Sequence, residues 1–423
     1  MTSVYKSYRA TRFLGGISQY ILAALFLFSG FVKAVDPVGT ALKVSDYLTA
    51  FGLSALRGLS LSCAVGLIVV EFSLGVLLLM GLFRRFTRWA VLVLMSAMTL
   101  LTFYIFLFEP VGDCGCFGDF LKISNRATFL KNLCFMVPTL FLFIKKRAWH
   151  PSFGSRSIQF SLLALGLFGI GFFIQQNLRH LPLFDFRPFR VGSSLAELVL
   201  RPEGAAEDLY SYQFIYEKEG KKALFEADSL PDSTWQYVDT QMTLLAEGYH
   251  PPVEDFVLFR DYEDVTRELI GNQNYNMIWV LAPHWGKASK KTIEAINQLY
   301  KYASDNGILF YGISGSDEQE IALWKEKSAA KYPMLLLDAS TIQTISRANP
   351  SILFLKKGVI QAKMNALDLR EGDIEAQVNA LFESEKPLSQ NALLRLLPLS
   401  LWFILTLVGL IVARERLQTP YTF

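Results

Sequence analysis

Long apolar stretches dominate the first 180 residues of the chain, and another lies near residue 400. A helix that crosses a bilayer needs about 20 mostly apolar residues, because the hydrocarbon core is about 30 Å thick. Six stretches meet this requirement: Phe13–Val35, Leu59–Leu82, Trp89–Phe108, Thr128–Ile144, Ile158–Ile174 and Leu393–Ala413. The apolar part of the first is too long for a secretory signal peptide, so we expect a retained membrane helix.

Between residues 178 and 392 the pattern changes to shorter apolar segments separated by polar turns. Residues 210–227 alternate apolar and polar positions around Glu219-Gly220, which predicts a β-hairpin. From residue 275 onward, predicted strands and helices alternate, which favours an α/β architecture. The predicted strands cover 275–282, 308–315, 333–338 and a hairpin turning at Lys357-Gly358, and the predicted helices cover 289–307, 317–332 and 368–383.

Composition agrees with a membrane protein that carries a soluble part. Of the 423 residues, 52% are hydrophobic and 34 are Phe, which is more apolar content than a soluble protein usually has. The formal net charge of +3 is small, and the sequence shows no phosphate-binding loop and no basic footprint for nucleic acid. We therefore expect contact with membrane lipid and no nucleic-acid partner.

Basic residues gather in four short segments: before the first apolar stretch, after the second, after the fourth and after the sixth. Short segments rich in Lys and Arg stay on the cytoplasmic side of a membrane. They contain Lys6, Arg9 and Arg12; Arg84, Arg85 and Arg88; Lys145, Lys146, Arg147 and Arg156; and Arg414 and Arg416. We predict a multi-pass protein of the bacterial inner (cytoplasmic) membrane with both termini in the cytoplasm. Residues 112–119 and the soluble part then face the periplasm.

Residues 112–119, GDCGCFGD, hold Cys114 and Cys116 between glycines. Cysteines at i and i+2 can close a small disulfide ring, and the glycines give the backbone the freedom to do so. Such a ring is strained, and strained disulfides are the more oxidising ones. Asp113 and Asp119 are expected to raise the pKa values of the thiols, which weakens the case for a reactive thiolate. A redox-active pair, a structural turn or disulfide, and inert packing all remain open.

No metal site is expected, because two cysteines without a nearby histidine fall short of the four ligands of structural zinc. Cys63 and Cys134 lie in the second and fourth spans, toward the same side as the two loop cysteines. They are either relays between the loop and the membrane or core packing.

Glu71 lies near the middle of the second span, where an ionisable group is costly and suggests a function. It is either a proton or quinone contact, or a protonated carboxyl that is hydrogen-bonded inside the bundle. Lys131, in the fourth span, is within reach of Glu71 or of the interface. Lys33 and Asp36 end the first span and are expected to be interfacial anchors.

The order of elements over residues 248–385 resembles the thioredoxin-like fold, and 248–259 resembles the first strand of its peroxiredoxin and TlpA-type branch. His284 and Trp285 occupy the corner where that family carries a Cys-x-x-Cys, and Pro350 matches its cis-proline position. No cysteine lies in this domain, so the domain cannot perform thiol chemistry itself. The resemblance implies either an inactive scaffold or a partner-binding face around these three residues.

Residues 25–37, 70–82 and 113–120 resemble the first span, the second span and the loop of the DoxX and MauE group of four-helix membrane proteins. Fusion to a redoxin-like domain is similar to Bacteroidetes-type envelope proteins. The resemblance implies quinone- or thiosulfate-associated oxidation, or maturation of disulfide-bearing periplasmic proteins. It makes a quinone the candidate cofactor, although no cofactor is certain.

The predicted fold is an α-helical membrane bundle, four-helix DoxX/MauE-like plus two further spans, with an extracytoplasmic α/β thioredoxin-like domain. Its parts are the bundle (1–150), a fifth transmembrane helix and exit segment (151–192), a β-rich extension (193–247), the thioredoxin-like domain (248–388), and a sixth transmembrane helix with a cytoplasmic tail (389–423).

Two functions remain open. The first is a membrane oxidoreductase for thiol-disulfide or quinone-linked chemistry, with Cys114 and Cys116 as the exchanging pair and Glu71 as a proton-handling group. The second is a non-catalytic membrane scaffold whose degenerate thioredoxin-like domain binds a periplasmic protein.

Overall fold

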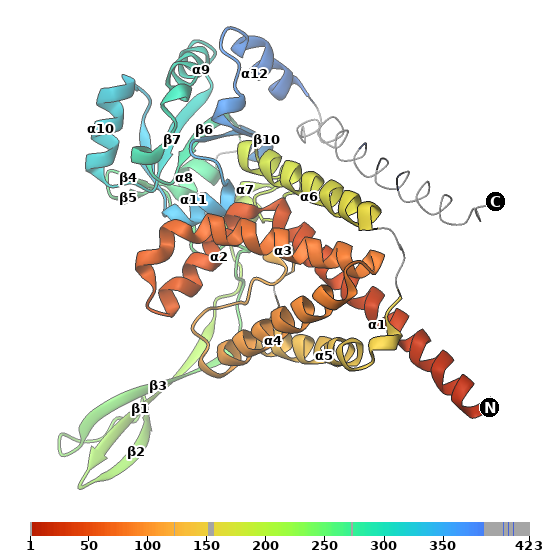
Figure 1. Ribbon diagram of the computed structural model, residues 1–423. Coiled ribbons are helices and arrows are strands. Elements are labelled where there is room, and N and C mark those ends of the chain that lie inside the picture. The colour runs from red at the N-terminus through yellow and green to blue at the C-terminus, as the bar shows by residue number, and fades with distance from the viewer. Residues whose placement is uncertain are drawn as a thin grey trace.

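The computed structural model describes residues 2–121, 123–150, 156–271 and 274–384, together with Leu401, Leu405 and Gly409. Figure 1 shows a bundle of long helices, a sheet-containing domain at one end of it, and a narrow separate sheet that projects away. In the described part of the chain, five helices are long and apolar enough to cross a membrane, which confirms the first five predicted spans. The predicted sixth span lies outside the described residues, apart from those three positions.

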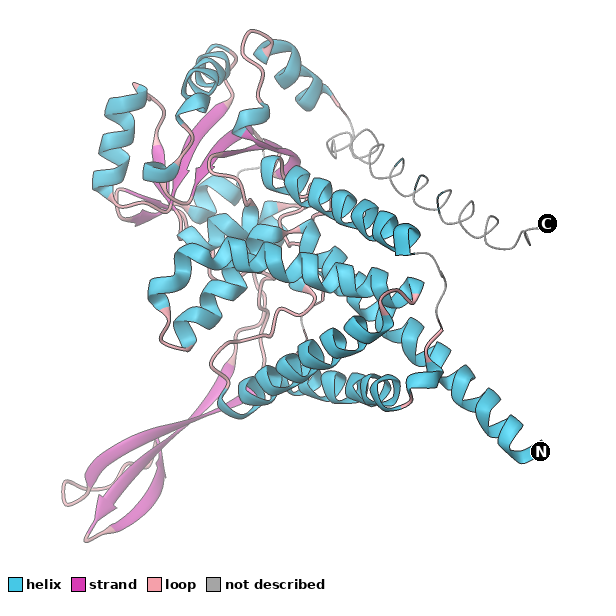
Figure 2. Cartoon of the chain, in the orientation of Figure 1, coloured by secondary structure: helices cyan, strands magenta, loops and turns pink. Residues whose placement is uncertain are grey.

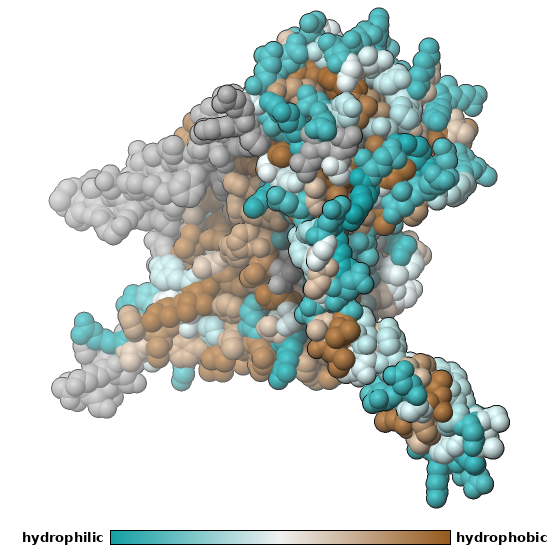
Figure 3. Space-filling model, turned by 180° about the vertical axis from the view of Figure 1, so that it is seen from behind, coloured by the Kyte–Doolittle hydropathy of each residue, from teal (hydrophilic) through white to brown (hydrophobic). Residues whose placement is uncertain are grey.

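The membrane helices are α1 (Thr2–Val35), α3 (Ser60–Met80), α4 (Arg84–Phe108), α5 (Asn125–Ile144) and α6 (Arg156–Arg179). Helix α1 packs along α3, α4 packs along α5, and α6 lies against α1 and α3. Leu22, Ile68 and Leu78 belong to the apolar interior. Figure 3 shows apolar surface gathered over the bundle and a mostly hydrophilic surface over the soluble domain. This distribution suits a bundle in lipid and a domain in water.

Hydrogen bonds tie two chain connections together at the end of the bundle away from the soluble domain. Trp149 Nε1 donates to the carbonyl of Gly81, where α3 turns into α4, at 3.1 Å. The side chain of Gln19 accepts from the backbone N–H of His150 at 3.0 Å. The short helix η3 (Lys146–Ala148) lies in the same connection. Two of the basic segments predicted to be cytoplasmic therefore lie at one end of the bundle.

A helix that the sequence patterns did not predict, α2 (Pro37–Ala50), covers the opposite end. Asp36 caps it, because its carboxylate accepts from the backbone N–H of Gly39 at 2.8 Å, and a proline stands at the first helical position. The short helix η1 (Ser54–Leu59) then leads into α3. An aspartate followed by a proline is a helix-start signal, so α2 was readable from the sequence.

The soluble domain is built on a seven-stranded mixed sheet of order β10-β9-β6-β7-β8-β4-β5. Strands β6, β7 and β8 are parallel, and β9 pairs with β6 antiparallel. The strands are β4 (Phe259–Arg260), β5 (Glu263–Asp264), β6 (Asn276–Ala282), β7 (Leu309–Ser314), β8 (Met334–Leu336), β9 (Ser351–Lys356) and β10 (Val359–Asn365). The predicted α/β alternation is thus confirmed, whereas the strand expected over 248–259 is reduced to β4.

Helices cover both faces of this sheet, as Figure 2 shows. Alternate residues of β6 point to opposite faces, so Trp279 packs against α7, α8 and α11, and Val280 packs toward α9, α10 and α12. Burial on both faces explains why β6 is a continuous apolar run. The helices are α7 (Leu195–Val199), α8 (Thr266–Gly271), η4 (Trp285–Lys287), η5 (Lys290–Thr292), α9 (Ile293–Asp305), α10 (Glu318–Ser328), α11 (Ala339–Ile345), η6 (Ala366–Asp368) and α12 (Ile374–Glu383).

A second, three-stranded antiparallel sheet of order β2-β1-β3 projects from the rest of the molecule (Figure 1). It consists of β1 (Leu209–Lys218), β2 (Lys221–Glu226) and β3 (Gln236–Ala246). The predicted hairpin is confirmed, since Glu219 and Gly220 have φ of 51° and 78°, as a two-residue turn requires.

The exit segment, residues 181–192, holds the soluble domain on the bundle through buried polar contacts. Asp185 accepts from Arg187 Nε at 2.9 Å and from Lys363 of β10. Burial opposes ionisation of Asp185, but the two cations keep its pKa below the usual range. Asn177 at the end of α6 donates to the carbonyl of Ala34 at 3.0 Å. The domain is therefore anchored to the bundle instead of hanging on a free linker.

Candidate cysteine-loop redox site

The cysteine loop, residues 109–124, connects α4 to α5 at the end of the bundle that faces the soluble domain. Cys114 and Cys116 are 7% and 6% exposed. Their Sγ atoms lie 2.8 Å apart, farther than the about 2.05 Å of a disulfide bond, and both are free thiols. Gly115 between them has φ of 64°, a left-handed conformation that favours glycine. The glycine therefore lets the two thiols face each other.

A buried hydrogen-bond network connects this loop to the interior of the bundle. Lys33 on α1 and Glu71 on α3 form an ion pair, with Nζ 2.7 Å from each carboxylate oxygen. Lys33 Nζ also donates to Ser29 Oγ at 2.8 Å. Ser29 Oγ lies 2.9 Å from Glu71 Oε2 and 3.0 Å from the backbone carbonyl of Cys116, and its single proton can go to either acceptor. Ser29 is the contact between the ion pair and the loop.

One expectation about the lysines is wrong, and one open alternative is decided. Lys33 is buried and paired instead of anchoring the helix at the interface, because α2 folds back over the end of α1. Lys131 points to the cysteine loop instead of Glu71, and its Nζ lies 4.2 Å from the centre of the Phe117 ring. Glu71 therefore forms an ion pair with a lysine of α1, and hydrogen bonds between neutral groups are not its only contacts.

Side chains of α2 cover the cysteine loop. The phenol of Tyr47 donates to the carbonyl of Cys114 at 2.6 Å, and Lys43 forms an ion pair with Asp113. Asp113 also accepts from the backbone N–H of Gly115 at 3.1 Å. These contacts hold the turn that brings the two sulfur atoms together.

The two thiols differ in acidity. A hydrogen bond from Cys114 lowers the pKa of Cys116 to about 6, against the effect of burial, and the cations of Lys131 and Lys33 act in the same direction. The same hydrogen bond, together with burial, raises the pKa of Cys114. Cys116 is thus the more acidic of the two thiols.

Arg347, between α11 and β9, joins the soluble domain to the cysteine loop. Its guanidinium donates to Asp36 at 2.8 Å and to Asp119 at 2.7 Å, and the side chain is 10% exposed. Asp113 is paired as well, with a lysine of α2. Both loop carboxylates thus have cationic partners. The expected rise in pKa is wrong for Cys116, whose pKa is lowered mainly by the hydrogen bond from Cys114.

Aromatic rings line another side of the loop. Phe117 packs edge-on against Phe28 with ring centroids 5.4 Å apart, and Phe28 packs in the same way against Phe120 at 5.5 Å. Phe28 and Phe120 are 40% and 45% exposed. The result is a partly open aromatic surface next to Cys116.

Cys63 and Cys134 are exposed on α3 and α5, whereas the loop thiols are buried. The structure brings Cys114 and Cys116 together but leaves the other two cysteines on the outer surface of the bundle. An internal relay of sulfur atoms therefore has no support here.

The predicted partner-binding face is only partly available. Trp285 is 1% exposed and stacks on Trp324 with centroids 4.6 Å apart, so its assignment to a binding face is wrong. The Asn349-Pro350 peptide is cis, as expected, and Pro350 is buried. Asn349 Nδ2 donates to the carbonyl of His284 at 2.8 Å. His284, half-buried, is the member of the predicted set that reaches the surface.

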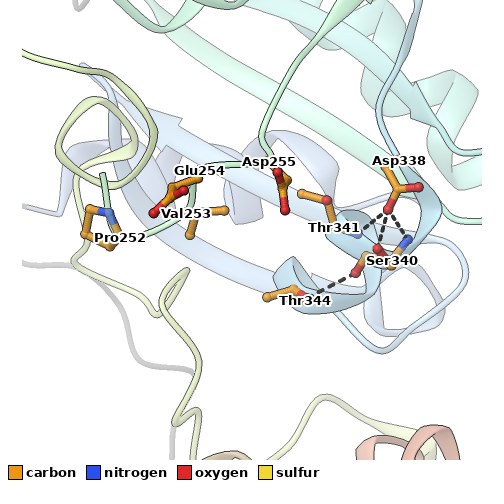
Figure 4. A pocket seen from close by; sticks show the side chains of 8 residues that line it. All are labelled: Pro252, Val253, Glu254, Asp255, Asp338, Ser340, Thr341 and Thr344. Atoms are coloured by element: carbon orange, nitrogen blue, oxygen red, sulfur yellow. Dashed lines mark hydrogen bonds between the residues drawn. The ribbon is translucent and has the colours of Figure 1, made fainter. Parts of the chain in front are cut away.

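A surface pocket of about 660 Å³ lies elsewhere on the soluble domain, beside α11 (Figure 4). Asp338, on its wall, caps α11 by accepting from Ser340 and Thr341 N–H groups at 2.8 and 3.1 Å. The hydroxyl of Ser340 and these backbone bonds lower the pKa of Asp338. Its carboxylate is thus used structurally. Among the described residues, no group of three or more His, Cys, Asp and Glu side chains is placed to hold a metal ion.

Four residues of this site were missed at the sequence level: Ser29, Lys43, Tyr47 and Arg347. Ser29 and Lys33 are four apart on α1, hence on one face, and a polar pair inside an apolar span is a readable signal. No sequence signal marks Arg347. Its contacts with Asp119 and Asp36 span 228 and 311 residues of sequence and follow only from how the soluble domain docks on the bundle.

These features define an integral membrane protein whose helical bundle holds a buried two-cysteine loop under a soluble α/β domain. Residues 11–145 match the family model of methylamine utilisation protein MauE, which covers α1 to α5 and the cysteine loop. The N-terminal region is therefore similar to the MauE family, in agreement with the resemblance seen in its sequence. Residues 210–247, which form β1 to β3, match a domain of unknown function, DUF8463. Comparisons with curated proteins and with solved structures gave no match.

Proposed function

We propose that the protein is a thiol-disulfide oxidoreductase of the bacterial inner membrane, with Cys114 and Cys116 as the exchanging pair. The observation that carries this proposal is the arrangement at the loop. Two free thiols lie 2.8 Å apart, and Ser29 connects the backbone carbonyl of Cys116 to the buried pair of Lys33 and Glu71. Perturbed thiol acidity beside a buried charge pair is typical of functional sites, and a purely structural turn needs neither.

In the proposed reaction the loop alternates between a disulfide and two thiols. A client thiolate attacks Cys114 Sγ, and Cys116 leaves as the thiolate because thiols of lower pKa leave faster. The second client thiol then attacks the mixed disulfide, so the client becomes a disulfide and the loop gains two electrons. Reoxidation of the loop passes two electrons and two protons to an acceptor. Glu71, connected through Ser29, takes part in the proton transfer.

The aromatic surface of Phe28, Phe117 and Phe120 supports a membrane quinone as the acceptor, because partly exposed rings suit a flat apolar ring. A bound quinone would supply the two-electron, two-proton reduction to a quinol. The chain's own contribution is to place Cys116 beside these rings and to connect the Glu71 carboxylate to the loop through Ser29.

The sidedness of the bundle supports the proposed orientation, in which the termini lie in the cytoplasm. The cysteine loop, α2 and the soluble domain lie at one end, and two basic connections lie at the other. The loop then faces the periplasm, where disulfides persist. We assign the soluble domain as a thioredoxin-like domain without thiols, which its central parallel strands and terminal hairpin support. His284 is its candidate contact for a periplasmic client.

Trapping the thiol state of the protein in its native membrane tests the proposal. Acid quenching followed by alkylation should show Cys114 and Cys116 oxidised at rest and reduced after a reductant is added, with recovery once the reductant is removed. Cys114→Ser should abolish this cycle, while Cys134→Ser, a matched change at an exposed cysteine, should not.

A non-catalytic scaffold is the second candidate, favoured by the burial of both thiols and by the missing cysteines of the soluble domain. In that case Cys114 and Cys116 stay in one state under every condition, and Cys114→Ser leaves the cellular phenotype unchanged. The trapping experiment therefore separates the two functions.

A further inference from the structure

Basic side chains approach the cysteine loop from four elements. Lys33 of α1 is paired with a glutamate, Lys43 of α2 with an aspartate, and Arg347 of the soluble domain with two aspartates. Lys131 of α5 differs from these three. Among the described residues, no carboxylate lies in ion-pair contact with Lys131.

Lys131 is half-buried in the second turn of α5, within a membrane-spanning segment. Its Nζ lies 4.2 Å from the ring centre of Phe117, the neighbour of Cys116 in sequence. A cation over an aromatic face gains roughly 0.5–2 kcal/mol, which is small beside the cost of a charge in an apolar span. An anion that forms close to Lys131 would therefore add to the stability of the charge at this position.

We propose that Lys131 is a positioning residue that stabilises the thiolate of Cys116 and thereby sets the pH range in which the loop reacts. The proposal rests on the proposed thiol chemistry, because it assigns the residue that tunes the same pair. The candidate anion is the sulfur of Cys116, whose thiolate form Lys131 favours. The carboxylates around the loop are already shared with other cations.

Other charged and titratable groups face Cys116, and they do not replace Lys131. Cys114 donates a hydrogen bond, and Lys33 favours the thiolate, but Glu71 opposes it from the other member of the same ion pair. Tyr47 contacts the backbone of Cys114 and carries no charge, because burial raises the pKa of its phenol. Lys131 is the cation whose effect is not cancelled by a bound carboxylate.

The pH dependence of alkylation tests this in the full-length, reduced protein with Cys63 and Cys134 replaced by Ala. The rate of iodoacetamide reaction at Cys116, followed by mass spectrometry, should rise with a midpoint at about pH 6. Lys131→Met should move the midpoint upward by about one pH unit or more, a tenfold loss of thiolate at acidic pH, as expected for loss of a nearby opposite charge. Lys131→Arg should keep the low midpoint, and Lys145→Met, at the far end of α5, should not change it.

An unchanged midpoint in Lys131→Met overturns the proposal, and so does an ordinary thiol midpoint in the unchanged protein. Lys131→Gln gives a second measurement if the methionine variant does not fold. The pH profile of alkylation is measured on reduced protein and does not require the cysteines to cycle. Failure of the proposed thiol-disulfide function can therefore be distinguished from failure of the role of Lys131. A shifted profile in a protein that never cycles supports Lys131 and refutes only the redox function.

Discussion

The buried ion pair of Lys33 and Glu71 leads to a quantitative prediction about the bundle. At 2.7 Å and an effective dielectric constant near 20, the attraction between two unit charges is about 6 kcal/mol, and desolvation of both groups offsets much of it. Glu71→Gln or Lys33→Met leaves one charge in an apolar interior without its partner. We expect each single variant to lose about 3–5 kcal/mol of unfolding free energy.

The double variant Lys33→Met/Glu71→Leu removes both charges and keeps similar volume. We expect it to lose much less than either single variant, because replacing a whole buried ion pair by apolar groups is often neutral or stabilising. Reversible unfolding of the full-length protein in mixed micelles, followed by tryptophan fluorescence, measures all four proteins. A loss of about 3–5 kcal/mol corresponds to roughly a hundredfold to several thousandfold change in the unfolding equilibrium.

Single variants that each lose under about 1 kcal/mol would refute this description of the pair, as would a double variant that loses the sum of both. The double variant also separates structure from function. If it is stable but its cysteines no longer cycle, Glu71 takes part in proton transfer. If it is stable and cycles normally, the pair is structural and Glu71 has no chemical role.

Two further predictions concern the soluble domain. Arg347→Ala leaves Asp36 and Asp119 without their shared cation, and the lost contact is worth about 2–5 kcal/mol. A bulky maleimide should therefore label the loop thiols at least about 30-fold faster in this variant. Arg347→Lys should give a smaller increase in labelling rate, and equal rates in variant and unchanged protein would show that this contact does not cover the loop. Trp285→Ala should destabilise the domain by about 3–5 kcal/mol in chemical unfolding, because the ring is in the core. His284→Ala should change the unfolding free energy by less than about 0.5 kcal/mol. Equal losses in the two variants would contradict the assignment of Trp285 to the core and His284 to the surface.

The membrane spans could be predicted from the sequence because the requirement is local, about 20 apolar residues in a row. The strands and helices after residue 275 were also readable, since β6 is a continuous apolar run and the turn at Lys357 and Gly358 has its own signature. Trp285 was assigned to a binding face in error, because the place of a residue in the order of strands and helices does not show how deeply its side chain is buried. Its burial depends on a stacking partner nearly 40 residues away in sequence.

Contacts between distant segments were out of reach for the same reason. The sequence placed Glu71 and the two loop cysteines as separate candidates, and only the packing of α1 between α3 and the cysteine loop makes them neighbours. The expected rise in thiol pKa failed for Cys116, because a hydrogen bond from Cys114 and two nearby lysines lower its pKa. Both carboxylates are compensated by cations from α2 and the soluble domain.

Burial of both thiols places a condition on any exchange with a protein client. Cys114 and Cys116 are 7% and 6% exposed, so a folded client reaches them only after a covering element moves. Arg347 is the contact through which the soluble domain resists such a movement, because it binds the loop and the start of α2 together. An opening that costs about 2–5 kcal/mol leaves roughly one molecule in 30 to one in several thousand open. Under the proposed function, the thiol-free domain acts on the reaction by limiting access, and the chemistry takes place at the loop.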